Sequence, residues 1–282
     1  MIVYRQFTLI VIFLFATFQN FAQINLGERL LGAAANGLKA LTFTNEDAAA
    51  LSLQAVAKMD KDNPVALPKD PYTIRLNKVF GNHISENGLK LNYKVYKLKD
   101  VNAFATADGS VRVFAGLMDI VDDNELLAVI GHEIGHVANE DSKDAMRAAF
   151  GKQALIDGAA SQSEKIAAMT DSQLGQIGKA MWDSKHNRQQ ETEADLFSYD
   201  FMKRNGYNVN AVESAFNILA KMGEGSNSDF ITRMMSSHPD PADRAQQAKE
   251  MATNDGLYKP YVKFSKTTKT AVKPAKKPIK KK

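Results

Sequence analysis

One stretch, residues 125–139, constrains this chain more than any other, because it combines a helical apolar pattern with two histidines four residues apart. Leu126, Ile130 and Ile134 recur every four residues, and Val137 follows three residues later. This spacing predicts a helix with one apolar stripe, the face with which a helix packs into a core. The two histidines therefore belong to a predicted buried helix.

His132 and His136 project from the same face of this helix, one turn apart, so that both imidazoles can meet one ion at the short distances that zinc needs. Glu133 follows the first histidine and is placed to act on the water that the zinc ion activates. The pattern His-Glu-x-x-His is rare in a chain with only five histidines. The alternative is a pair of core histidines without a metal. The sequence predicts a catalytic site with one zinc ion per chain and with Glu133 as its base.

Two histidines leave such a site one ligand short, because a catalytic zinc ion takes three protein ligands and a water. The helical segment 191–195 offers carboxylates. Glu191 and Asp195 share a face, so Glu191 could bind the metal while Asp195 accepts a hydrogen bond from a liganding histidine. From spacing alone Glu193 is an equal candidate. His186 is a rival that we disfavour, because residues 185–190 have the composition of a polar loop.

Strand signals come before the metal helix. Leu91, Tyr93 and Val95 alternate with polar residues, which predicts a strand. Segments 101–106 and 111–115 flank an Asp-Gly pair, which predicts a β-hairpin. Gly131 and Gly135, beside the two histidines, would permit close packing of the metal helix against this sheet, although they could equally be small core residues.

Helical patterns dominate the rest of the chain. Thr44 with Asp47, and Asp122 with Glu125, have the spacing of capping boxes. We expect helices from Thr44 to about Met59, from Tyr72 to about Asn82, and from Asp122 to about Gln247 with breaks near residues 206, 223–225 and 239. Helices, a small antiparallel sheet and then many helices make an α+β fold.

The two ends of the chain differ from its body. Arg5 and the apolar run Phe7–Phe18 are typical of a secretory signal, because a membrane span needs about 20 apolar residues. We expect cleavage after Ala22; an uncleaved anchor or a buried helix is the alternative. The chain has no cysteine, which excludes disulfides and a lipid-modified cysteine and favours a bacterial periplasm.

Residues 263–282 contain nine lysines and no acidic residue, so the net charge of +4 hides a mildly acidic body. Such a segment should be disordered, and it could contact an anionic surface or serve only as a solvated tail. We therefore divide the chain into a signal peptide (1–22), a metallopeptidase domain (23–262) and a lysine-rich tail (263–282). An exported protein seldom meets nucleic acid, so no nucleic-acid partner is expected.

Four ordered segments resemble peptidase family M48, the HtpX and CAAX-prenyl-protease type of zinc metallopeptidase. They are Asn102-Ala103-Phe104-Ala105, His132-Glu133-Ile134-Gly135-His136, Glu191-Thr192-Glu193-Ala194-Asp195, and Ser237-His238-Pro239 with Arg244. The likeness covers roughly residues 40–250 in order and spacing. Because no long apolar span follows Phe18, the chain is most similar to the soluble, exported, BepA-like branch. It lacks the tetratricopeptide array of that branch, so the role of that array does not carry over.

The resemblance implies a mostly helical, zincin-type domain with a small antiparallel sheet or hairpin next to the metal-binding helix. It implies that Glu191 is the third zinc ligand and that Asp195 contacts a ligand and not the zinc ion itself. Asn102, Ala103, Phe104 and Ala105 would form the strand on which an extended substrate pairs.

His238 is implied to approach the metal from the far lobe, with Arg244 fixing its loop. It would either stabilise the oxyanion or occupy the open coordination position in a closed state.

The predicted function is hydrolysis of peptide bonds by an exported zinc metalloendopeptidase, either free in the periplasm or associated with a membrane. Its substrates would be polypeptides, above all unfolded or misassembled envelope proteins. One alternative is a latent or non-cleaving, zinc-bound, chaperone-like binder of envelope proteins. A weaker one is a cell-wall hydrolase recruited by the lysine-rich tail.

Overall fold

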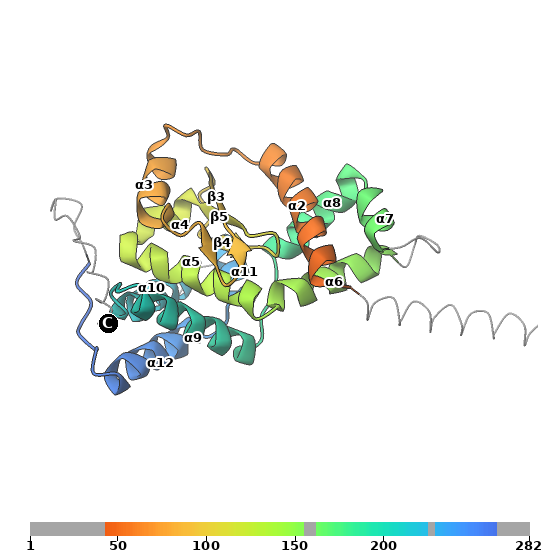
Figure 1. The fold of residues 1–282 in the computed structure, drawn as a ribbon. Helices are drawn as coiled ribbons and strands as arrows, with labels where there is room; N and C mark the ends of the chain where they lie inside the picture. The colour runs from red at the N-terminus through yellow and green to blue at the C-terminus, as the bar shows by residue number, and fades with distance from the viewer. Residues whose placement is uncertain (1–42, 155–161, 225–228, 264–282) are drawn as a thin grey trace, which may run out of the picture.

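The computed structural model describes residues 43–154, 162–224 and 229–263, and within them helices surround a small sheet (Figure 1). The predicted signal peptide and the tail beyond Lys263 lie outside the described residues. None of the described helices is both long and apolar enough to cross a membrane. The elements are, in order, α2 (Asn45–Asp62), α3 (Pro71–Phe80), β1 (Ser85–Glu86), β2 (Leu89–Lys90), β3 (Asn92–Tyr96), β4 (Ala103–Ala105), β5 (Ser110–Phe114), α4 (Ala115–Ile120), α5 (Asp123–Ala138), α6 (Asp141–Ala154), α7 (Gln162–Ala167), α8 (Asp171–Trp182), α9 (Arg188–Arg204), α10 (Asn210–Gly223), α11 (Asp229–Ser237) and α12 (Pro241–Asn254).

The main sheet has three strands in the order β3-β5-β4. The predicted hairpin is confirmed: β4 and β5 pair antiparallel, and Gly109 in their turn has a φ of 82°, which favours glycine. The predicted third strand, β3, joins the other side of β5, but it pairs in parallel. The strand β4 is therefore an edge of this sheet.

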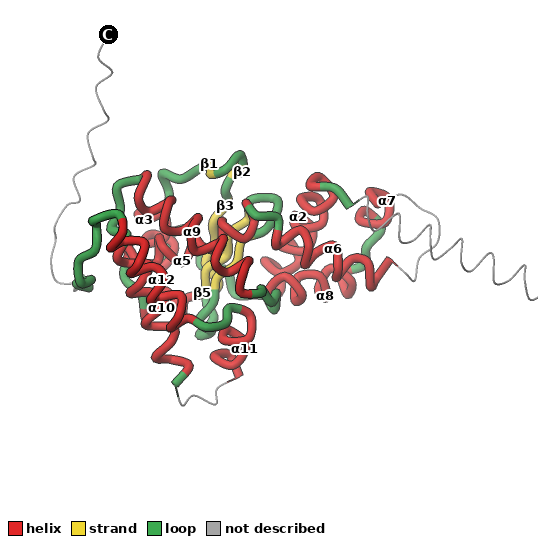
Figure 2. Tube along the Cα trace, turned by 90° about the horizontal axis from the view of Figure 1, so that it is seen from below, coloured by secondary structure: helices red, strands yellow, loops and turns green. Residues whose placement is uncertain are grey.

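Successive side chains of a strand point to opposite faces of a sheet, and in β4 and β5 the residues on both faces are buried. One face carries small and β-branched residues and packs on α5; the other carries aromatic rings and packs on α2 and α8 (Figure 2). Arg112 also points to the second face, where its Nε lies 2.8 Å from Asp60 of α2. The first face includes Val95, Ala103, Val111 and Val113, and the second includes Tyr96, Phe104 and Phe114.

The apolar stripe of α5 is buried as predicted, with Leu126, Ile130 and Ile134 fully inside the core. Its glycines, however, do not pack against the sheet. A Cβ atom on Gly135 would lie 2.9 Å from the Cα of Ala194, and one on Gly131 would lie 3.1 Å from the ring of Phe201. Both contacts are with α9, because the stripe already occupies the side of α5 that faces the sheet.

The predicted helix starts are confirmed where capping chemistry marks them. Thr44 with Asp47 and Asp122 with Glu125 form reciprocal capping boxes at α2 and α5. Short α4 was not predicted, because it follows β5 directly and Phe114 caps it without a side-chain hydrogen bond. The last helix, α12, also continues beyond the expected end near Gln247.

Candidate metal centre

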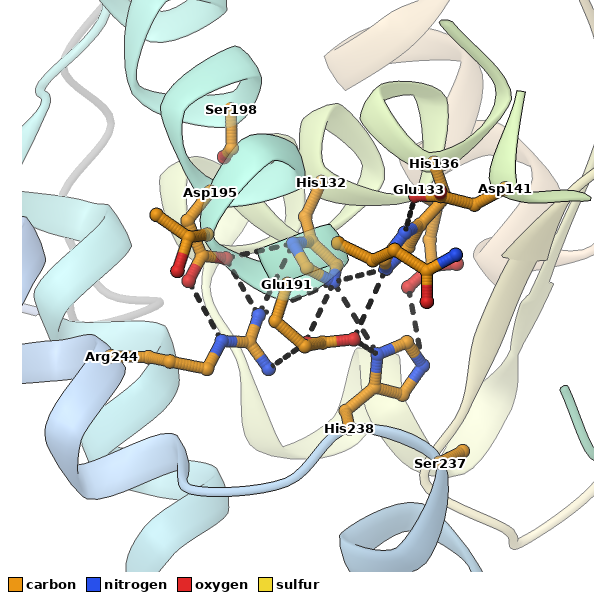
Figure 3. Close-up of polar contacts among 12 residues, drawn as sticks. His132, Glu133, His136, Asp141, Glu191, Asp195, Ser198, Ser237, His238 and Arg244 are labelled. Carbon is orange, nitrogen blue, oxygen red and sulfur yellow. Dashed lines mark hydrogen bonds and ion pairs between the residues drawn. The ribbon is translucent and has the colours of Figure 1, made fainter. Parts of the chain in front are cut away.

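Three separate parts of the chain bring together four side chains that could hold a metal ion (Figure 3). His132 and His136 come from α5, Glu191 comes from the first turn of α9, and His238 comes from the turn between α11 and α12. Their ligand atoms all lie within 4.8 Å of one another. The first three side chains are almost completely buried. Sequence spacing left Glu193 equal to Glu191, but Glu193 lies on the exposed side of α9.

The separations of these atoms suit a tetrahedral ion. Nε2 of His132 lies 3.0 Å from Nε2 of His136 and 3.6 Å from Oε2 of Glu191, and Nε2 of His136 lies 3.3 Å from Oε1 of Glu191. Nδ1 of His238 is 3.4 Å from His132 Nε2 and 3.1 Å from Glu191 Oε1. Ligand atoms of a tetrahedral zinc ion are about 3.3 Å apart, given bonds of about 2.0–2.1 Å.

Two further observations indicate that a cation belongs here. Facing imidazole nitrogens 3.0 Å apart repel each other unless a proton or a cation lies between their lone pairs. Oε2 of Glu191 is buried and, although Arg244 is its neighbouring cation, no hydrogen bond of good geometry reaches it. Two histidines and a carboxylate form a donor set typical of catalytic zinc. The residues present therefore fit the metal.

Asp195 and Arg244 support one side of this centre. Nδ1 of His132 lies 2.8 Å from a carboxylate oxygen of Asp195, so that Nε2 faces the other donors. Arg244 is buried and donates two hydrogen bonds to Asp195, and it also contacts Glu191. Burial favours the neutral form of Asp195, but this guanidinium outweighs it and lowers the pKa of the carboxyl. The side chain of Arg244 thus holds the two carboxylates, and its backbone N–H donates at 3.1 Å to the carbonyl oxygen of Asp240 in the turn that carries His238.

Asp141 supports the other side, and sequence analysis missed it. Its Oδ2 lies 2.9 Å from Nδ1 of His136. Burial opposes the charged form of His136, but hydrogen bonds with Asp141 and Glu191 outweigh it and raise the pKa of His136 to about 9. Glu140 has a φ of 64°, so the chain reverses after α5 and returns Asp141 to the ring. The signal in the sequence that could have identified Asp141 was its position as an acidic residue directly after the metal helix.

Comparisons with known proteins agree with this geometry. The family model of peptidase family M48 matches residues 75–252. This chain belongs to peptidase family M48. The metalloprotease LoiP of Escherichia coli K12 is 39% identical over 231 residues, which cover 81% of this chain and 89% of LoiP. The metalloprotease YcaL of the same organism is 39% identical over 223 residues, or 78% and 85% of the two chains.

A putative beta-barrel assembly-enhancing protease of Vibrio cholerae is 29% identical over 181 residues, which cover 60% of this chain and 36% of that protein. Together these relatives identify the M48 chain as a metal-dependent protease.

His186 of this M48 protease lies beside the centre without joining the four donors. Its ring stacks on that of His136, with centroids 3.7 Å apart and an angle of 14° between the planes. The nitrogen lone pairs of an imidazole lie in its ring plane, and the planes of two stacked rings do not meet at one ion; His186 instead groups with His136 and Asp141, whose ligand atoms lie within 4.8 Å of its own. Burial, together with the positive charges of His136 and His238, lowers the pKa of His186 to about 2. His186 is therefore better suited to line the site as a neutral ring than to act as a metal ligand.

The predicted base and the predicted substrate strand also meet at this centre. Glu133 of the M48 protease is buried, and one of its oxygens lies 3.9 Å from Nε2 of His238. Two hollows flank these side chains, and Ala103 of the edge strand β4 and Glu133 line both of them. Asn102 lines the first hollow, and Phe104 and Ala105 line the second. The structure thus gathers every predicted site residue around one centre.

Proposed function

We propose that this protease is a zinc-dependent endopeptidase with His132, His136 and Glu191 as its metal ligands. The observation that carries the proposal is the convergence of these three donors with separations that suit a tetrahedral zinc ion. Asp195 and Asp141 would hold the two rings in the tautomer that presents Nε2 to the metal.

In this proposal the residues of the chain divide the reaction between them. A bound zinc ion would polarise the scissile carbonyl group and acidify the attacking water. Glu133 takes the proton from that water and later passes it to the leaving amine. His238, 3.9 Å from Glu133, would offset negative charge on the carbonyl oxygen once it moves out from among the donors.

We infer that the substrates are extended polypeptides that pair with the edge of β4. In the register of β4 with β5, the backbone N–H and C=O groups of Ala103 and Ala105 point away from β5. The Ala103 N–H contacts the side chain of Asn102, and the Ala105 carbonyl accepts a bond from Ser142. Pairing along an edge requires a locally unfolded segment.

A role in envelope protein quality control is supported by the relative named for β-barrel assembly and by the apolar run behind Arg5, which is typical of export. Contact of the lysine-rich tail with an anionic surface stays a prediction, as does a periplasmic location.

The second candidate is a latent, rarely cleaving binder, and the position of His238 favours it. Its Nδ1 lies among the other donors, so His238 could fill the coordination position that a substrate needs. In that case the resting protein would bind clients without cutting them.

Replacing Glu133→Gln tests the proposal. We expect the wild-type protein to digest casein or an unfolded outer-membrane protein, with loss of activity in chelator and recovery on adding zinc. The variant should keep about one zinc ion per chain and lose at least about 100-fold in rate, because it lacks the proton acceptor. Glu193→Gln, exposed on α9, is the control and should keep both zinc and activity.

Full activity of Glu133→Gln would contradict the assigned base. Client binding without any chelator-sensitive cleavage would favour the latent binder.

A further inference from the structure

His238 separates the two hollows that flank the metal donors. One has a volume of about 30 Å³ and the other about 20 Å³, and Ala103, Glu133 and His238 line both. Each volume admits only one or two water-sized molecules. The two hollows beside β4 are therefore small in this conformation, and withdrawal of His238 would join them into one groove.

The segment before α9 holds the turn that carries His238. The backbone N–H of His186 donates to the carbonyl oxygen of Ser237 at 3.1 Å. Nε of Arg188 lies 2.8 Å from Oδ2 of Asp240. These two contacts attach residues on both sides of His238 to the segment that ends at the first residue of α9.

The turn that carries His238 has a strained backbone. Asp240 has a φ of 55° and a ψ of 45°, in the left-handed region that side chains rarely adopt. It also precedes Pro241, and the residue before a proline favours an extended backbone. Asp240 caps α12 without a side-chain hydrogen bond. Strain of this kind persists only where surrounding contacts hold it, and it would be released if the turn opened.

We propose that Arg188 is a positioning residue that, through its ion pair with Asp240, holds His238 over the metal donors and limits access of substrate to β4. This inference rests on the proposed function, because it concerns the same peptide groove. Arg188 is 83% exposed and Asp240 37%, so the pair shifts the balance between closed and open forms by only about two- to five-fold.

Arg188→Ala provides the test. Substrate binds only the open form, so the apparent KM for a fluorogenic peptide should fall about two- to five-fold while kcat at saturation stays unchanged. Asp240→Asn should do the same, because asparagine also tolerates the left-handed region. The double variant should show no further gain, since both changes remove one interaction.

Two controls match this design. Arg188→Lys keeps a cation beside Asp240 and should behave as wild type. Lys203→Ala removes another exposed ion pair, Lys203 with Asp255, at the opposite end of the same helix, and should leave KM unchanged.

A readout independent of cleavage comes from Trp182, the only tryptophan of the chain, which lines the second hollow with His186. Acrylamide should quench its fluorescence more strongly in Arg188→Ala than in wild type or Lys203→Ala. Stronger quenching in a protein that cleaves nothing would support the positioning role and refute the proposed function. Normal cleavage with unchanged KM and quenching, or a lower kcat alone, would overturn the role of Arg188.

Discussion

At the level of single residues, the metal centre depends on two carboxylates that are not ligands themselves but orient the histidine rings. Asp195 and Asp141 each contact the Nδ1 atom of one histidine, at 2.8 Å and 2.9 Å, so both Nε2 atoms point inward. The neighbouring histidines outweigh burial and hold the pKa of Glu191 well below its usual range. Glu191 is therefore ionised, as a carboxylate ligand must be, while His136 would have to release a proton when a metal binds.

Replacing Asp141→Ala should weaken zinc binding about 10–100-fold, because His136 loses the acceptor that fixes its ring. Competition with a chromophoric chelator measures the affinity. Asp144→Ala, in the same first turn of α6 but exposed, is the control and should bind zinc as wild type does. Equal affinity of the two variants would show that Asp141 has no part in orienting His136.

At the scale of elements, the distance between α5 and α9 sets the distance between the histidines and Glu191. Gly135 allows the two helices to approach closely, since a Cβ there would meet the Cα and the carbonyl oxygen of Ala194 at 2.9 Å and 3.0 Å. Ser198 adds a buried hydrogen bond of 2.7 Å to the carbonyl oxygen of Ala128. These contacts hold α9 close to α5, and so they hold Glu191 close to His132 and His136.

Gly135→Ala should lower the free energy of unfolding by about 1–3 kcal/mol, because backbone atoms of α9 cannot move aside for the new methyl group. It should also reduce the zinc content, since the helices must separate. Thermal unfolding and metal analysis measure the two effects. Gly175→Ala, on α8 with open space around it, should be neutral or stabilising by up to about 1 kcal/mol. A Gly135→Ala protein as stable and metal-rich as wild type would refute this account.

At the scale of the whole molecule, the C-terminal end of the described chain returns to the start of the metal helix. The hydroxyl of Tyr261 donates to the carboxylate of Asp122, the N-cap of α5, at 2.7–2.8 Å. Lys263 contacts the carbonyl oxygen of Ile120 at 2.6 Å and the buried carboxylate of Glu125 at 3.2 Å. The segment 257–263 therefore covers acidic groups that begin the metal helix.

Truncation after Gly256 should cost at least about 2 kcal/mol of stability, because it removes hydrogen bonds to charged groups and leaves Glu125 without its cation. Truncation after Lys263 is the control and should leave stability unchanged. Urea denaturation at equal protein concentration compares the two. If both shortened chains unfold at the same midpoint as wild type, the segment contributes nothing to the fold.

Several parts of the structure could be predicted because short-range chemistry encodes them. The capping residues Thr44 and Asp122 fixed helix starts, the Asp108-Gly109 pair predicted the hairpin, and the four-residue spacing of His132 and His136 put them on one face. The parallel pairing of β3 was missed, because no local signal records which strand a neighbour will join.

The donor types and the helix that presents two of them could be predicted from residue identity and spacing, because both depend on neighbours in the chain. The packed fold was needed to choose between Glu191 and Glu193, to place Asp141 beside His136 and to set His238 between two hollows. Those outcomes depend on how α5, α9 and the α11–α12 turn pack together. Packing joins residues that are far apart in the chain, so their spacing along the sequence does not encode it.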